Sequence, residues 1–159
     1  LPNGDPPHKT DKIITPAVHR LAMLQLAVEG IPYFRISDME IRRKGYSYSS
    51  VTLEELKKAH PDTDYYFIMG ADSLFQIETW HEPAVILAAM RNHTPDDVFK
   101  KQMDYLEAKY HADIRFLNIP DLALSSSEIR HRVREHQSIR FMVPEGVREY
   151  IEEHQLYCR

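Results

Sequence analysis

Helix-like and strand-like patterns alternate along this chain, and this alternation limits its fold more than any other feature. Residues 65–69 form a short, continuous apolar run, which is typical of a strand buried on both faces of a parallel sheet. Gly70 and a helical pattern follow at once. The scheme recurs, with strands predicted over 34–41 and 114–119 and helices over 16–29, 51–56, 83–90, 96–110 and 144–155. The chain is therefore predicted to be an α/β protein with a mainly parallel sheet.

One junction departs from the alternation. No strand is predicted between the helices over 83–90 and 96–110, because polar residues follow the first helix directly.

Three helical regions supply the apolar residues that are expected to form the core. They are Val18, Leu21, Leu24 and Val28; Val98, Met103 and Leu106; and Phe141, Val143, Val147, Ile151 and Leu156.

Composition excludes several classes of protein. The 159 residues suffice for one domain with a real core. The net charge of -4 argues against a protein that binds nucleic acid over a broad surface. No apolar run approaches the ~20 residues of a membrane span. Cys158 is the only cysteine, so no internal disulfide is possible and a reducing cytoplasm is the expected location.

Residues 122–134 combine an apolar entry, three serines and a basic helical pattern. Ser125 and Glu128 have the spacing of a capping box at a helix start. Free backbone N–H groups at that start, together with Arg130, Arg132 and Arg134, suit a phosphate ligand. The alternative interpretation is an ordinary capped surface helix with a solvated basic face.

Two further regions have polar groups where an α/β fold places ligands. Gly70 and Asp72 follow the apolar run at 65–69, where a glycine lets a ligand approach the backbone and a carboxylate can bind ribose hydroxyls. Ser49 or Ser50 can cap the helix over 51–56. Trp80, the only tryptophan, suits either packing or stacking against an aromatic ring.

Other catalytic chemistries lack their motifs. The nine histidines include no H-x-x-x-H pair and the cysteine has no partner, so we expect no protein-held metal site. Neither a P-loop nor a G-x-G-x-x-G turn occurs. A G-x-S-x-G elbow is also absent, which argues against a serine hydrolase.

Taken together, five stretches resemble bacterial nicotinate mononucleotide adenylyltransferases of the nucleotidylyltransferase superfamily. They are residues 2–9 (PNGDPPHK), 44–53 (KGYSYSSVTL), 67–73 (FIMGADS), Trp80 and 124–130 (LSSSEIR). The resemblance implies a Rossmann-like parallel sheet flanked by helices, in a single nucleotidylyltransferase domain over residues 1–159. The family's G-G-T-F-D-P-x-H-x-G-H motif has no counterpart in this sequence. We expect that motif, with the first strand and helix, upstream of Leu1.

The resemblance also implies an activity and a set of site residues. Family members join nicotinate mononucleotide to the AMP part of ATP, releasing pyrophosphate. By resemblance, the mononucleotide would be bound by Asn3, Lys9, Tyr48, Ser49, Trp80 and Arg91. The nucleotide riboses would face Gly70 and Asp72. The ATP phosphates would be bound by Ser126, Ser127 and Arg130, with Mg²⁺ bridging the phosphates and Arg130 acting in catalysis.

Two other functions stay open at this point. One is a non-catalytic nucleotide-binding module that lacks the histidine motif. The other is a related adenylyl- or cytidylyltransferase with another acceptor, against which Trp80 and the pair Tyr48 and Ser49 argue. The sequence does not rank nicotinate against nicotinamide mononucleotide, and it is compatible with a homodimer.

Overall fold

The computed structural model describes residues 1–5, 14–87, 90–91, 97–115 and 124–158. The chain forms two compact units, which we treat separately. Unit 1 comprises Leu1–Ser47 and Leu122–Arg159, and unit 2 comprises Tyr48–Asp121. The assignment of residues 1–159 to a single nucleotidylyltransferase domain stays a prediction.

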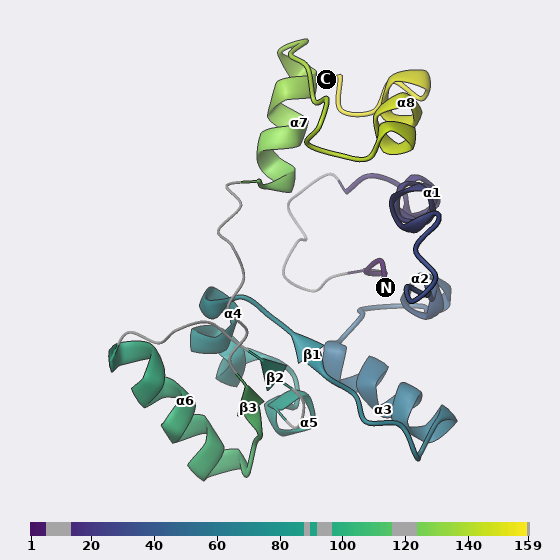
Figure 1. Ribbon diagram of the computed structural model, residues 1–159. Coiled ribbons are helices and arrows are strands. Elements are labelled where there is room, and N and C mark those ends of the chain that lie inside the picture. The colour runs from purple at the N-terminus through teal and green to yellow at the C-terminus, as the bar shows by residue number, and fades with distance from the viewer. Residues whose placement is uncertain (6–13, 88–89, 92–96, 116–123, 159) are drawn as a thin grey trace. The chain divides into compact units, whose positions relative to one another are not determined.

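Unit 2 contains a three-stranded parallel sheet with strand order β1-β2-β3 (Figure 1). Phe67 pairs with Met90, and Met90 pairs with Ile114. In chain order the elements are α3 (Ser49–Ala59), β1 (Phe67–Ile68), α4 (Ala71–Gln76), η1 (Ile77–Thr79), α5 (Pro83–Leu87), β2 (Met90–Arg91), α6 (Asp97–Tyr110) and β3 (Ile114–Arg115). Strands and helices alternate, as the sequence pattern predicts.

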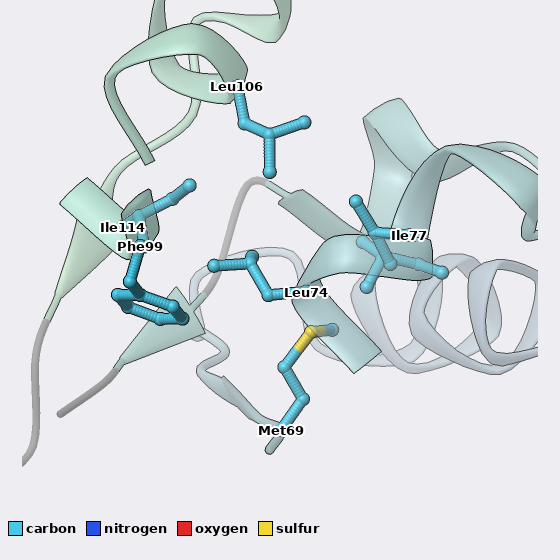
Figure 2. Packing of buried hydrophobic residues seen from close by; sticks show 7 residues of the cluster. Met69, Leu74, Ile77, Phe99, Leu106 and Ile114 are labelled. Carbon is cyan, nitrogen blue, oxygen red and sulfur yellow. The ribbon is translucent and has the colours of Figure 1, made fainter. Parts of the chain in front are cut away.

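The core of unit 2 joins α4 and α6 to the residues around the strands (Figure 2). Its buried members are Met69, Leu74, Ile77, Ile86, Phe99, Leu106 and Ile114. Side chains of this size each gain about 1.5–3 kcal/mol when fully buried. Strand and helix apolar positions therefore stabilise the unit jointly.

Three expectations for the strands and for α6 are wrong. A strand, β2, lies where none was predicted, and it is the middle strand of the sheet. Ile68 is 73% exposed, so burial on both faces fails at this residue. Val98 is 64% exposed because Phe99, Met103 and Leu106, at positions i, i+4 and i+7, form the inward face of α6.

Unit 1 is helical in the parts that the structure describes. Its elements are α1 (Ala17–Val28), α2 (Met39–Arg42), α7 (Ser126–Arg134) and α8 (Glu145–Glu153). Ile139, Val147 and Ile151 form its buried cluster. Partly buried residues from α1 and α7 pack against them: Met23, Leu26, Ala27, Ile129 and Val133. The predicted docking of the C-terminal helix through Val147 and Ile151 is confirmed.

Unit 1 also departs from the predicted pattern. Residues 34–41 do not form a strand, because the Asp38 carbonyl accepts a hydrogen bond from the Arg42 N–H and begins the single turn of α2. Val18 is exposed, and α1 packs through Met23 and Leu26 instead. Phe141 is 98% exposed, in a tight turn closed by a hydrogen bond from the Met142 N–H.

Within the described ranges, no helix combines the length and apolar character needed to cross a membrane.

We predict that Leu106→Ala lowers the free energy of unfolding by about 2–5 kcal/mol, because it leaves a cavity at a side chain that is 0% exposed. Urea denaturation followed by circular dichroism measures the change. Val98→Ala, on the same helix, is the matched control and is expected to stay within about 0.5 kcal/mol of wild type. Equal losses in both variants would contradict the assigned face of α6.

Candidate functional site

The segment that carries Asn3 is held by α1 and by the turn after α2. The Arg20 guanidinium donates from Nη1 to the Asn3 carbonyl, and from Nε to the Thr15 carbonyl at 2.9 Å. The Ser47 N–H donates to the Asp5 carbonyl at 2.8 Å. These contacts fix the backbone of Asn3, whose side chain is exposed. Lys9 lies outside the described residues.

Gly4 lies where no larger residue fits. A Cβ built at this position would fall inside van der Waals contact with the Glu40 carbonyl and with Ser47 Oγ. A cavity of about 300 Å³ adjoins the segment, and its lining includes Gly4, Asp5, Arg20 and Arg43. Two arginines and one aspartate thus line a hollow beside Asn3.

The start of α7 has the half of the predicted capping box in which Ser125 is the acceptor. Ser125 is the N-cap residue, and its Oγ accepts a hydrogen bond from the Glu128 N–H at 3.1 Å. Arg130 Nη2 donates to Ser127 Oγ at 3.2 Å. The Ile129 N–H bonds to the Ser125 carbonyl and closes the first turn. The backbone N–H groups of Ser126 and Ser127 precede that bond, so this turn presents an arginine, hydroxyls and backbone donors together.

The basic face of α7 is not uniform. Arg132 Nε donates to the Ser138 carbonyl at 3.0 Å, and its Nη1 lies 3.8 Å from Glu128 Oε1. Arg134 is exposed in the last turn. Of the three arginines in the sequence pattern, Arg130 is the one that contacts a hydroxyl of the first turn.

The start of α3 differs from the prediction. Ser49 and Ser50 do not cap the helix, because Tyr48 is the N-cap residue and both serines lie inside the first turn. Ser50 Oγ instead lies 3.1 Å from His81 Nδ1, and the His81 ring stacks on Tyr48. Sequence reasoning missed His81. The only signal was its position directly after Trp80.

Trp80 follows η1 and is half-buried against the core of unit 2. Phe67 meets it edge to face, with ring centroids 6.5 Å apart and planes at 86°. The Trp80 N–H donates to the Ile77 carbonyl at 3.0 Å. The lone tryptophan is therefore a packing residue that stays partly exposed.

A polar cluster fastens η1 to α6. Glu78 Oε1 accepts hydrogen bonds from Lys109 Nζ at 2.5 Å and from the Tyr110 hydroxyl at 3.0 Å. The Tyr105 hydroxyl donates to the same oxygen at 3.2 Å. The bond from Lys109, more than the others, lowers the pKa of the Glu78 carboxyl below its ordinary value. The same bond, which Lys109 donates to Glu78, raises the pKa of the Lys109 ammonium. Glu78 thus helps to fix the turn that carries Trp80.

The carboxyl ends of β1 and β2 bring three predicted residues to one sheet edge. Gly70 is the N-cap residue of α4, and no described atom lies within 4 Å of a Cβ built there. Asp72 is exposed in the first turn of α4. Arg91 ends β2 and pairs with Ile68 of β1, so its backbone lies at the same edge. Ligands of open α/β sheets bind at this edge.

The described residues include no group of three or more His, Cys, Asp or Glu side chains arranged to hold a metal ion.

Each unit holds a separate set of predicted site residues. Unit 1 contains Asn3, Ser126, Ser127 and Arg130, and unit 2 contains Tyr48, Ser49, Gly70, Asp72, Trp80 and Arg91.

Known proteins resemble this chain over most of its length. A family model described as cytidylyltransferase-like matches residues 1–132. A probable nicotinate-nucleotide adenylyltransferase of Lachnoclostridium phytofermentans is 41% identical over 163 residues, covering 99% of this chain and 82% of that protein. A probable nicotinate-nucleotide adenylyltransferase of Salinibacter ruber is 39% identical over 160 residues, covering 99% of this chain and 80% of its own length.

Solved structures share the fold. The Plasmodium falciparum nicotinic acid mononucleotide adenylyltransferase complexed with APC matches with a TM-score of 0.66 and 20% identity, covering 91% of this chain and 77% of that one. The complex with NaAD matches with a TM-score of 0.64 and 22% identity, covering 94% of this chain and 78% of that one. These matches confirm the predicted Rossmann-like α/β class.

We predict that Gly4→Ala lowers the free energy of unfolding by about 1–3 kcal/mol, because the Glu40 carbonyl is backbone and cannot rotate away. Gly146→Ala is the matched control in the same unit. Its Cβ would meet Leu26 Cδ2 at an ordinary 3.5 Å, so its stability is expected to equal or exceed that of wild type. Chemical denaturation compares the two, and a Gly4→Ala protein as stable as Gly146→Ala would refute the tight fit.

The Glu78 cluster predicts a pH dependence of stability. Because its folded pKa is lowered, Glu78 contributes stability that is present above the ordinary value of 4.5 and lost as pH falls through the folded pKa. Unfolding curves recorded between about pH 7 and pH 3 should therefore show a shallower acid loss for Glu78→Gln than for wild type. Lys109→Gln should flatten the curve in the same way. Parallel curves for all three proteins would contradict this coupling.

Proposed function

This chain belongs to the cytidylyltransferase-like family, as a relative of the nicotinate-nucleotide adenylyltransferases, and from this premise we propose its reaction. It transfers the adenylyl group of ATP to nicotinate mononucleotide, giving nicotinate adenine dinucleotide and pyrophosphate. The mononucleotide phosphate attacks the α-phosphorus of ATP, and pyrophosphate leaves. The observation that carries the proposal is the first turn of α7, where Arg130 and Ser127 are hydrogen-bonded at a capped helix start.

In this proposal, the start of α7 binds the ATP phosphates. Backbone N–H groups at a helix N-terminus and the arginine fork both favour an anion. Ser126 and Ser127 add hydroxyl donors. Arg130 is the catalytic residue of this set, since its guanidinium stabilises negative charge that develops on the phosphates during transfer.

Other residues in the proposal bind the mononucleotide and the riboses. Asn3 and Lys9 bind the mononucleotide phosphate, which the arginine-lined hollow beside Asn3 supports. Tyr48 and Ser49 face the nicotinate carboxylate at the start of α3, and Trp80 stacks on the nicotinate ring. The riboses face Gly70 and Asp72, and Arg91 binds phosphate. The open space at Gly70 and the exposure of Asp72 support this assignment.

Mg²⁺ enters the proposal as a companion of ATP. Mg²⁺ commonly keeps several waters and binds through substrate phosphates rather than an all-protein cage. The start of α7 offers hydroxyls and an arginine, and its first turn has one acid, Glu128. Such a set suits phosphates that bring Mg²⁺ with them, because one carboxylate does not form a metal cage. When bound, the ion neutralises charge on the phosphates.

The proposed partners are therefore ATP and nicotinate mononucleotide, with a cytoplasmic location inferred from the single cysteine. The net charge of -4 argues against a role in binding nucleic acid. A homodimer stays a prediction. A transferase with another acceptor is less consistent with the stacked Tyr48 and the half-buried Trp80, which suit a flat aromatic acceptor.

Pyrophosphate release from the full-length protein tests the function. We expect release from ATP and Mg²⁺ only when nicotinate mononucleotide is present. Arg130→Ala should lower kcat/KM by about 10²–10³, the typical loss for one donor to a developing anion. Arg134 is exposed in the last turn of the same helix, so Arg134→Ala is the control and should keep the wild-type kcat/KM.

Three results would change the proposal. Mononucleotide binding without turnover would identify a non-catalytic nucleotide-binding module. Turnover with a different acceptor would identify a related transferase. A wild-type kcat/KM in Arg130→Ala would remove Arg130 from the site.

A further inference from the structure

His81 joins two parts of unit 2 that the proposed function assigns to one substrate. The imidazole stacks on Tyr48 with ring centroids 4.4 Å apart and planes at 24°. Its Nδ1 lies 3.1 Å from Ser50 Oγ. Tyr48 is the N-cap residue of α3 and Ser50 is the second residue of the helix, so His81 contacts the first turn at two points. Trp80 precedes it in the chain.

The contact with Ser50 is a buried one. Ser50 is 0% exposed, and a buried hydroxyl that loses its partner destabilises the fold. Glu82 Oε2 lies 3.3 Å from the same nitrogen of His81. A carboxylate only accepts hydrogen bonds, so it favours the form in which Nδ1 carries its single proton, which Glu82 Oε2 and Ser50 Oγ then share. The orientation of the imidazole is thus determined from two sides.

The turn that carries Trp80 and His81 is fixed independently. Glu78 ties η1 to α6 through Lys109 and Tyr110, and Trp80 packs against the core. The first turn of α3 is the other element, and its first intrahelical hydrogen bond runs from the Thr52 N–H to the Tyr48 carbonyl at 3.2 Å. The N–H groups of Ser49, Ser50 and Val51 precede this bond. His81 is therefore a link between a fixed turn and a helix start with free donors.

We propose that His81 is a positioning residue that sets the preference for nicotinate over nicotinamide mononucleotide. The inference rests on the proposed function, which places the pyridine ring on Trp80 and its substituent at the start of α3. A carboxylate accepts hydrogen bonds from backbone N–H groups and is attracted to a helix N-terminus. A carboxamide is uncharged, and its NH₂ group is a donor that meets other donors there. The discrimination requires the helix start to be held in register with Trp80, and His81 holds it.

Trp80 itself reports on the experiment, because it is the only tryptophan in the 159 residues. A stacked pyridine ring quenches indole fluorescence, so titration with nicotinate mononucleotide and with nicotinamide mononucleotide gives two Kd values. For wild type, the nicotinate form should bind more tightly. His81→Phe keeps an aromatic ring and loses the hydrogen bond, whereas Ser50→Ala keeps the imidazole and removes the hydroxyl. Each should reduce the ratio of the two Kd values about tenfold, which corresponds to about 1.4 kcal/mol, the size of one hydrogen bond.

Further measurements separate positioning from loss of structure. The Kd of ATP should stay at its wild-type value in both variants, since a general loss of structure would weaken it as well. The double variant should lose no more selectivity than the stronger single variant, because both changes break one contact. His60→Asn, at the exposed C-terminal end of the same helix, is the control and should keep the wild-type ratio.

The two proposals fail in different ways. If the mononucleotides quench Trp80 but the ratio of their two Kd values is unchanged in Ser50→Ala and His81→Phe, the role of His81 is overturned. The proposed function is then left intact. If His81→Phe does not fold, Ser50→Ala alone decides the question by the same ratio. If neither mononucleotide quenches Trp80 in the wild-type protein, the proposed mononucleotide site fails, and the role of His81 fails with it.

Discussion

The parallel pairing of β1, β2 and β3 is the interaction on which the arrangement of unit 2 depends. Each strand has only two residues, yet Phe67, Met90 and Ile114 stand in one register across the sheet. This pairing brings the carboxyl ends of β1 and β2 to the same edge, where Gly70, Asp72 and Arg91 lie. Backbone hydrogen bonds therefore place these residues, and the buried side chains beneath them keep the strands in position.

Three helices begin with the same backbone conformation at the N-cap residue but differ in the side chains found there. Tyr48, Gly70 and Ser125 are all extended N-cap residues. Ser125 alone among these three caps its helix with its own side chain. At α3 the first-turn serine is satisfied by a histidine from another segment, and at α4 the cap has no side chain at all. Each of these helix starts leaves backbone N–H groups in its first turn, and in general such groups favour anions.

Motifs that are local in sequence were predicted well, and packing directions were not. The Ser125 cap, the helices α1, α6 and α8 and the parallel α/β class follow from spacing and composition. Val98 and Phe141 were expected to be buried and are exposed, because an apolar residue one position from a helix face, or in a tight turn, points away from the core. The strand β2 was not predicted, because a strand of two residues is too short to show an alternating pattern.

The sequence by itself determined the family, the fold class and the capped helix start at Ser125–Arg130, since each depends on local spacing or on ordered motifs. Only the tertiary structure revealed His81 at Ser50 and Tyr48, Arg20 at Asn3, and the tight fit of Gly4. These contacts join residues that are 16 or more positions apart, or depend on the path of a distant backbone. No local pattern encodes such contacts, because they form only when the two segments pack.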